Sequence, residues 1–207
     1  MVTVVNYLEQ ILWQDWRYTP CGWSRGENVI NSIFNGAGNQ FKIMEKVEFK
    51  IRKICEKDKE WIRKFIIKEW GSEKIISCGK AYYPHKLPGF VAVANKKYLG
   101  LVTYILRKEK CELISLNTLR KGKGIGTTLL EAVKSSVRKI GCKKIFLATT
   151  NDNLNALRFY QKRGFNIKAF YPDSITCARK KLKPEIPLLG NYGIPIRDEI
   201  GLEIILN

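Results

Sequence analysis

From residue 46 onward, the sequence alternates between segments with the period of a β-strand and segments with the period of an α-helix. Apolar or alternating runs predict strands over 47–54, 90–94, 98–106, 111–118, 145–148, 165–171 and 200–206. Helical spacing predicts helices over 61–70, 125–140 and 155–163, each followed by a glycine. The proline-rich stretch 184–195 interrupts regular structure. This order predicts an α/β domain in which helices pack on a mixed sheet.

The composition changes near residue 41. Residues 1–41 carry only Arg17 and Arg25 as basic residues, and they hold Trp13, Trp16 and Trp23. A chain of about 40 residues buries too little surface to be a stable domain on its own. We therefore expect residues 1–41 to be an N-terminal extension of unknown role that packs on a main domain over 42–207. A partner-binding tail is the less favoured alternative.

The net charge of +18 raises the question of a nucleic-acid partner, because clustered Lys and Arg side chains attract phosphates. The lysines are spread along the chain and form no single tract interleaved with aromatic residues. This distribution favours a lysine-rich solvated surface. Part of the charge also suits an anionic ligand such as a nucleotide cofactor.

The cysteines and the N-terminal sequence bear on metal sites and location. None of the cysteines forms a C-x-x-C pair, and His85 is the one histidine, so neither a metal site nor a disulfide framework is expected. We expect reduced, mostly buried thiols at Cys21, Cys55, Cys78, Cys111, Cys142 and Cys177. No apolar run reaches the ~18 residues that span a bilayer, and the first residues lack the pattern of a secretory signal. A cytoplasmic protein without a membrane partner is expected.

The most informative local motif is the glycine-rich stretch Lys121-Gly122-Lys123-Gly124-Ile125-Gly126-Thr127, which joins a predicted strand to an amphipathic helix. The buried stripe of that helix is expected at Ile125, Leu129, Ala132, Val133, Val137 and Ile140. Glycines turn several backbone N–H groups toward one point, and the first N–H groups of a helix have no internal partners, so the stretch is suited to a phosphate. The P-loop and dinucleotide-fold spacings are absent. The pattern [Q/R]-x-x-G-x-[G/A] fits with Lys121 in first position, and a tight turn without a ligand is the alternative.

A second motif, Asn153-Leu154-Asn155-Ala156-Leu157-Arg158-Phe159-Tyr160-Gln161-Lys162-Arg163-Gly164-Phe165, follows the next strand. It resembles the N-x-x-A-x-x-[FL]-Y-x-[KR]-x-G-F signature of GNAT superfamily N-acetyltransferases. Residues 112–116 also resemble that family's central strand, and the resemblance covers about residues 46–183. It implies a mixed, mostly antiparallel central sheet flanked by helices. Lys121 departs from the family's usual Gln or Arg and lacks guanidinium geometry.

The resemblance implies a site for acetyl-CoA as acyl donor. Its pantetheine arm is expected along Leu116, Asn117 and Thr118 as an added strand. Its pyrophosphate is expected on the stretch from Lys121 to Thr127, with charge from Lys121 and Lys123. Asn153 and Ala156 are expected to line the far wall, and Arg158 or Lys162 to meet the outer phosphate.

The implied reaction is direct attack of a neutral amine on the thioester. An alkylamine with a pKa near ~10.4 must first lose a proton. Glu112 is the candidate acceptor, with an ordinary exposed strand carboxylate as the equal alternative; the loop histidine His85 is a weaker candidate. Tyr160 is expected to donate to the departing thiolate, the alternative being a core aromatic. A backbone N–H near Leu116 or Asn117 is expected to stabilise the carbonyl oxygen.

The acceptor is expected to be a small-molecule or peptide amine, bound by a monomer or homodimer. Residues 71–90 are expected to shape its site, with Tyr82 and Tyr83 as walls. Residues 194–199 are expected to close over it; Asp198 and Glu199 attract a cationic amine there or are solvated surface acids. Two other classes remain open: a non-catalytic acyl-CoA-binding module and a nucleic-acid (tRNA) binding protein. Turnover separates the first from an enzyme, and a steep salt dependence of binding identifies the second.

Overall fold

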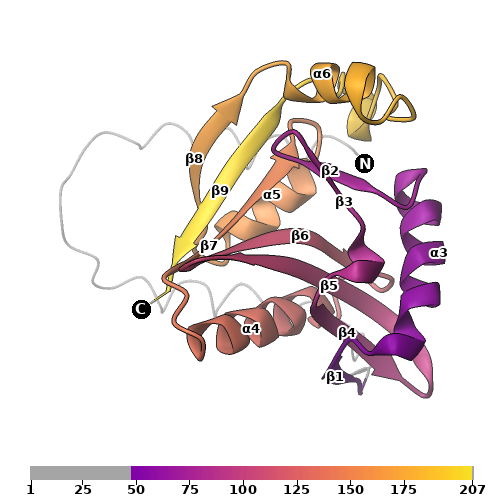
Figure 1. Cartoon of the computed structure of the whole chain (residues 1–207), viewed down its shortest axis with the longest axis vertical. Coiled ribbons are helices and arrows are strands. Elements are labelled where there is room, and N and C mark those ends of the chain that lie inside the picture. The colour runs from indigo at the N-terminus through magenta and orange to yellow at the C-terminus, as the bar shows by residue number, and fades with distance from the viewer. Residues whose placement is uncertain (1–47, 207) are drawn as a thin grey trace, which may run out of the picture. The chain divides into compact units, whose positions relative to one another are not determined.

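The computed structural model describes residues 48–206, and Figure 1 shows how their elements are arranged. The expected extension 1–41 and its boundary with the main domain lie outside the described residues. Among residues 48–206, no helix is long and apolar enough to cross a membrane.

Seven strands form one sheet in the order β1-β4-β5-β6-β7-β9-β8. All neighbours run antiparallel, except that β6 and β7 run parallel. This arrangement confirms the expected mixed, mostly antiparallel sheet. The strands are β1 (Lys50–Lys53), β4 (Gly89–Ala94), β5 (Lys97–Arg107), β6 (Lys110–Thr118), β7 (Lys144–Thr150), β8 (Asn166–Tyr171) and β9 (Glu199–Ile205).

Helices cover both faces of the sheet. Helices α4 (Ile125–Arg138) and α5 (Leu154–Gln161) contribute Leu129, Leu130 and Tyr160 to a hydrophobic core on one face. Helix α3 (Lys59–Trp70) and the hairpin of β2 (Ile75–Ser77) and β3 (Lys80–Tyr82) form a second core on the other face. Strand residues divide between these cores because successive side chains point to opposite faces: Phe90 and Val102 belong to the first, Val91 and Leu101 to the second.

The predicted helix 125–140 is confirmed, but its expected end is wrong. The helix ends at Arg138, and Ile140 is 59% exposed, although it was expected in the buried stripe. The chain turns out of the helix because Gly141 has a φ of 80° and the N–H of Cys142 donates to the carbonyl of Val137. Ile140 therefore lies in the turn and not on the buried face.

The C-terminal part completes the sheet. Strand β9 lies between β7 and β8, so the predicted strand 200–206 is confirmed and forms part of the sheet interior. Helix α6 (Ser174–Lys181) was not expected, because only Ile175 and Ala178 of its residues are buried apolar side chains. Short 3-10 turns at Glu56–Asp58, Pro84–Lys86 and Asn191–Gly193 connect other elements.

The expectation of mostly buried thiols is wrong for the described part of the chain. Cys111 and Cys142 are buried, but Cys55, Cys78 and Cys177 are exposed, and all five are free. Cys78 is exposed because it lies in the tight turn between β2 and β3, where its φ is 47°.

Candidate active site

The glycine-rich stretch forms the bend between β6 and α4. Gly122 and Gly124 have φ values of 74° and 76°, and a Cβ atom on either would meet nothing within 4 Å. The first helical hydrogen bond runs from Thr128 N to Gly124 O, so the amides of residues 125–127 precede the helical ladder. Open space, free helix-start amides and positive φ values together make this bend suitable for an anion. The side chain of Ile125 is buried, so only its amide is available there.

Strands β6 and β7 separate beside this bend. They pair only from Lys110 with Lys144 to Glu112 with Phe146, although β6 continues to Thr118. The register between β5 and β6 shifts opposite Ile114, which is a β-bulge that bends β6. The edge of β6 over 113–118 therefore presents backbone N–H and C=O groups to the gap, as an added extended chain requires. In addition, Oδ1 of Asn117 is buried and has no hydrogen-bond partner in the described structure.

Helix α5 forms the opposite wall of this gap. Oδ1 of Asn153 accepts from the N–H of Ala156 at 3.2 Å, so Asn153 caps the helix. A Cβ atom on Gly126 would lie 3.3 Å from the ring of Phe159 and 3.4 Å from Cγ2 of Thr118. Helix α5, the start of α4 and the end of β6 therefore meet at one place, as the two motifs predicted.

A basic residue that the sequence analysis did not single out also lies at this junction. The guanidinium of Arg163 lies 3.6 Å from the ring centroid of Phe159 and donates from Nε and Nη2 to Oγ1 of Thr127. It places a fixed positive charge beside the first turn of α4. Arg158 and Lys162, which the sequence analysis considered for the outer phosphate, lie within five residues of Arg163 in the sequence. Their spacing does not distinguish the three residues.

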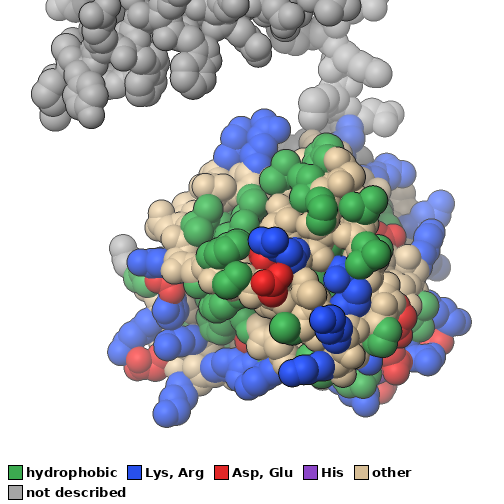
Figure 2. Space-filling view, turned by 90° about the horizontal axis from the view of Figure 1, so that it is seen from above, with side chains coloured by type: hydrophobic (Ala, Val, Ile, Leu, Met, Phe, Trp, Pro, Cys, Tyr) green, Lys and Arg blue, Asp and Glu red, His purple; other side chains and the backbone are tan. Residues whose placement is uncertain are grey.

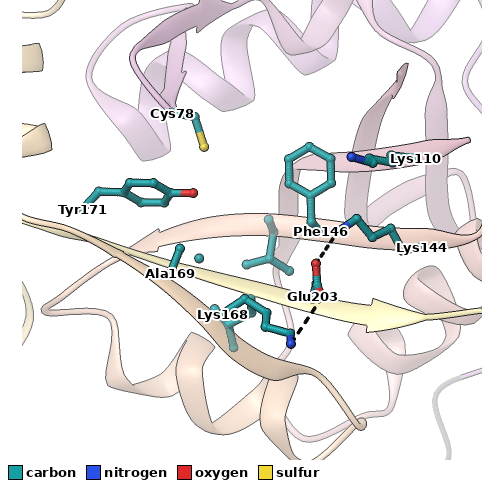
Figure 3. A pocket seen from close by; sticks show the side chains of 11 residues that line it. Cys78, Lys110, Lys144, Phe146, Lys168, Ala169, Tyr171 and Glu203 are labelled. Carbon is teal, nitrogen blue, oxygen red and sulfur yellow. Dashed lines mark hydrogen bonds and ion pairs between the residues drawn. The ribbon is translucent and has the colours of Figure 1, made fainter. Parts of the chain in front are cut away.

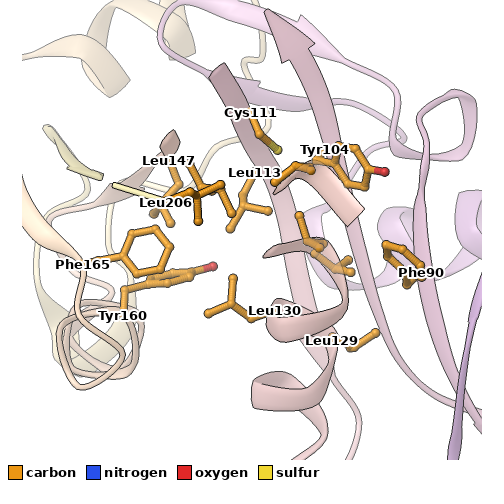
Figure 4. Close-up of a cluster of buried hydrophobic side chains, with 14 of the residues drawn as sticks. Phe90, Tyr104, Cys111, Leu113, Leu129, Leu130, Leu147, Tyr160, Phe165 and Leu206 are labelled. Carbon is orange, nitrogen blue, oxygen red and sulfur yellow. The ribbon is translucent and has the colours of Figure 1, made fainter. Parts of the chain in front are cut away.

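Tyr160 points from α5 into the first core (Figure 4). Its side chain is 8% exposed, and its ring packs edge-on against Phe159 and Phe165. Figure 4 shows the hydroxyl directed between Leu113 and Leu130, toward β6. Burial raises the pKa of Tyr160 above its usual value. The hydroxyl therefore stays protonated at neutral pH and is able to donate a hydrogen bond.

Glu112 is the last residue of β6 that pairs with β7, and it points to the face opposite Tyr160. It is only 2% exposed. Oε2 accepts from Nε of Arg107 at 2.9 Å, and Oε1 accepts from Oγ of Ser77 at 3.0 Å. Arg107 also donates to the hydroxyl of Tyr82 at 2.5 Å, so Tyr82 lies beside this carboxylate.

A second buried carboxyl, Glu199 of β9, lies close to Glu112. The amide of Cys78 donates to its Oε1 at 3.4 Å, and the side chain is 3% exposed. Burial raises the pKa of Glu199, and the charge of Glu112 contributes in the same direction. Within residues 48–206, no lysine or arginine pairs with it. The alternative that Asp198 and Glu199 are solvated surface acids is therefore wrong.

Asp198 is buried for a structural reason. Its Oδ1 accepts from the amide of Asp173 at 2.7 Å, and Arg197 donates to it from Nε at 3.2 Å. This carboxylate ties the turn after β8 to the start of β9. In the sequence, the one signal that distinguishes Glu199 from Asp198 was the strand pattern of 200–206. Glu199 directly precedes that predicted strand and extends it by one residue.

His85 lies in the 3-10 turn Pro84–Lys86, where Tyr83 packs edge-on against its ring. Its Nδ1 is buried without a partner in the described structure, and burial lowers the pKa of the imidazole. The structure shows no contact of His85 with Glu112 or Tyr160.

A pocket of about 190 Å³ opens on the same sheet face as Glu112 (Figure 3). Phe146, the pairing partner of Glu112, points into it. Cys78 and Tyr171 lie at one end, while the side chains of Lys110, Lys144 and Lys168 lie along the rest of it. Glu203 lies between Lys144 and Lys168, 2.5 Å and 3.8 Å from their Nζ atoms.

Comparison with known proteins gives a consistent assignment. The acetyltransferase (GNAT) family matches residues 53–165. The chain is 42% identical over 149 residues to the uncharacterized protein YxbD of Bacillus subtilis, an alignment that covers 72% of this chain and 93% of YxbD. It is 41% identical over 143 residues to the uncharacterized protein YdhI of the same organism, covering 69% and 89% of the two chains.

Solved structures share the fold. An IAA acetyltransferase from Bacillus cereus superposes with a TM-score of 0.62 at 26% identity, covering 77% of this chain and all of that one. A GNAT family acetyltransferase from Elizabethkingia anophelis with acetyl-CoA bound superposes with a TM-score of 0.54 at 19% identity, covering 76% and 98% of the chains.

Proposed function

Because this chain belongs to the acetyltransferase (GNAT) family and is therefore an acyltransferase, we propose that it transfers an acetyl group from acetyl-CoA to a primary amine of a small molecule or peptide. The observation that carries the proposal is the meeting of two features: a bend of open, positive-φ glycines at the start of α4, and the unpaired edge of β6 beside it. The bend is suited to a pyrophosphate, and the edge is suited to an extended amide-containing arm.

The residues at this junction fit the donor. The amides of residues 122–127 would hold the pyrophosphate, with Lys121, Lys123 and the fixed guanidinium of Arg163 supplying positive charge. Leu116, Asn117 and Thr118 would pair with the pantetheine arm, and the buried, unpartnered Oδ1 of Asn117 would gain a donor there. Asn153 and Ala156 would line the far wall. When bound, acetyl-CoA supplies the activated thioester.

Tyr160 is the proposed proton donor to the departing sulfur. Its hydroxyl points toward β6 from the α5 side of the gap, and its raised pKa keeps it protonated. A backbone N–H of the β6 edge near Leu116 or Asn117 is the proposed donor to the carbonyl oxygen as that atom gains charge.

Glu112 and Glu199 are the two candidates for the carboxylate that accepts the proton of the amine. Glu112 has both oxygens engaged, one by Arg107 and one by Ser77. Glu199 has no cationic partner in the described structure, and a raised pKa makes a carboxylate a better base near neutral pH. We propose that the pair acts together: Glu112 with Arg107 fixes the local charge, and one of the two carboxylates takes the proton.

The experiment that tests the proposal measures thiol release from acetyl-CoA with a panel of primary amines. We expect amine-dependent release, and a loss of kcat in both Glu112→Gln and Glu199→Gln. The variant that also loses the acidic limb of the pH–rate profile identifies the proton acceptor. Tight binding of acetyl-CoA without turnover on any amine would instead indicate a binding module.

A further inference from the structure

The pocket on the Glu112 face carries an excess of positive charge. Lys110, Lys144 and Lys168 line it, and Glu203 is its one lining carboxylate. The hydrogen bond from Lys144 lowers the pKa of Glu203, so this carboxylate is ionised at neutral pH. A single carboxylate between two lysines leaves the pocket with surplus cations, an arrangement that attracts an anionic group.

The opposite end of the same pocket has the other sign. Cys78 and Tyr171 line that end, the amide of Cys78 donates to Glu199, and Tyr171 is the cross-strand partner of Glu199. Glu199 supplies the negative charge at this end, and burial together with that carboxylate raises the pKa of the Cys78 thiol, so the thiol reacts slowly and chiefly at alkaline pH. Glu112 lies two residues from Lys110 on β6, roughly 7 Å along the strand, on the same face.

The floor of the pocket is kept open by a glycine. A Cβ atom on Gly201 would lie 3.2 Å from Cβ of Ala169 and 3.3 Å from the ring of Tyr171. Both of these residues line the pocket, as does Gly201 itself. Any larger side chain at 201 would therefore occupy the space between the three lysines and the end of the pocket lined by Cys78 and Tyr171.

We propose that the amine acceptor carries its own carboxylate, with the amine held at the end of this pocket lined by Cys78 and Tyr171, beside Glu199, and the carboxylate held by Lys110, Lys144 and Lys168. The proposal rests on the proposed function and specifies its substrate class. Phe146, the last residue of β7 that pairs with β6, lines the pocket, so the pocket reaches the place where the gap assigned to the thioester opens. An acceptor that carries one or two positive charges and no carboxylate would leave the three lysines without an anionic partner.

The first experiment compares matched acceptors in the thiol-release assay. ω-Amino acids with two to five methylenes are compared with n-alkylamines of equal length, with the methyl esters of the same amino acids, and with putrescine. We expect the best ω-amino acid to have a kcat/KM at least about tenfold above its ester and its alkylamine. Equal or higher kcat/KM for the neutral or dicationic amines overturns the proposal while leaving acetyl transfer itself intact. No turnover with any amine overturns the function on which it rests.

The second experiment locates the effect. Lys168→Met and Lys110→Met should each raise KM for the ω-amino acid by roughly two- to fivefold, the range of an exposed ion pair, and should leave KM for the alkylamine unchanged. Lys139→Met removes an exposed lysine at the end of α4, outside the pocket, and is the matched control. An equal change for both acceptors, or an effect of the control as large as that of Lys168→Met, contradicts the assignment.

The third experiment does not require turnover. Labelling of Cys78 by N-ethylmaleimide at pH 8.5, followed by peptide mass spectrometry, reports occupation of the pocket. We expect the ω-amino acid to slow the labelling of Cys78 but not that of Cys55 or Cys177, and Gly201→Val to abolish this protection while acetyl-CoA still binds. Protection by the alkylamine alone, or protection that survives in Gly201→Val, overturns the proposal.

Discussion

Nε of Arg107 donates to Oε2 of Glu112 at 2.9 Å, and this ion pair joins a 40% exposed guanidinium to a carboxylate that is almost wholly buried. The exposed guanidinium of Arg107 compensates the charge of the buried Glu112 carboxylate. Glu112 is almost wholly buried, and within residues 48–206 its carboxylate accepts hydrogen bonds from Arg107 and from the hydroxyl of Ser77. This ion pair distinguishes Glu112 from Glu199, which has no cationic partner among residues 48–206 and accepts from the amide of Cys78.

Arg107→Met should destabilise the protein and lower its activity. Removing one partner of a fully buried pair costs about 3–5 kcal/mol, and the exposure of Arg107 reduces this to an expected 1–3 kcal/mol, measured by urea unfolding. The kcat should also fall, because the carboxylate of Glu112 loses the guanidinium that holds it in place. Lys143→Met removes a largely exposed partner of Glu109 and should change neither quantity.

Gly124→Ala should weaken acetyl-CoA binding. An alanine at a φ of 76° is strained by about 1–2 kcal/mol, and its relaxation would turn the neighbouring amides away from the pyrophosphate. Gly141→Ala is the matched control, since its φ is 80°, its Cβ would also meet nothing, and it lies at the other end of α4. Calorimetry should show a loss of affinity only in Gly124→Ala, although both variants lose similar stability. Equal affinities in the two variants would contradict the role of the bend.

Tyr160→Phe should lower kcat by roughly 100-fold, the typical contribution of a positioned acid, with little change in KM for acetyl-CoA. Tyr104→Phe removes another buried hydroxyl from the same core and should leave kcat unchanged. Because burial raises the pKa of Tyr160, the wild-type profile should show no alkaline decline from this group between pH 7 and pH 9. A normal kcat in Tyr160→Phe would remove the residue from the mechanism.

Asp58 should make stability depend on acid pH. Its buried carboxylate accepts from Arg52 at 2.6 and 2.7 Å and from Tyr98 at 2.8 Å, and the bond from Arg52 is the main cause of its lowered pKa. Because the folded-state pKa of Asp58 lies below the unfolded value of ~3.9, the ionised carboxylate stabilises the protein above that pH. This stabilisation is lost as the pH falls toward the folded-state pKa. Wild type should therefore lose more stability between pH 5 and pH 2 than Asp58→Asn. Glu56→Gln, at an 85% exposed side chain, should behave as wild type.

Much of the fold follows from local pattern, and the exceptions have physical causes. The helix of α3 and its glycine end were predictable because Ile62, Phe65 and Ile66 share one face and Gly71 adopts a φ of 74°. The β4–β5 hairpin was predictable from Asn95-Lys96, which both take positive φ. Helix α6 was not predictable, because only Ile175 and Ala178 of its side chains are buried and apolar, and the β2–β3 hairpin was not, because its strands have three residues each.

The candidate site also has parts that the sequence predicted and parts that it did not. The bend at Gly122–Gly126 and the α5 motif are each contiguous in sequence, so each was recognisable on its own, and the resemblance to the GNAT family implied that they meet at one site. Glu112 and Glu199 are brought together by the insertion of β9 between β7 and β8, a pairing far apart in the chain. Arg163 was missed because its role depends on packing against Phe159 and not on its position in the motif.

The most direct measurement is a crystal structure of the protein grown with CoA. The account predicts pyrophosphate oxygens within hydrogen-bond distance of the amides of residues 122–127, with the pantetheine chain paired to β6 over 113–118. CoA bound elsewhere, with the bend and the β6 edge facing solvent, would contradict it.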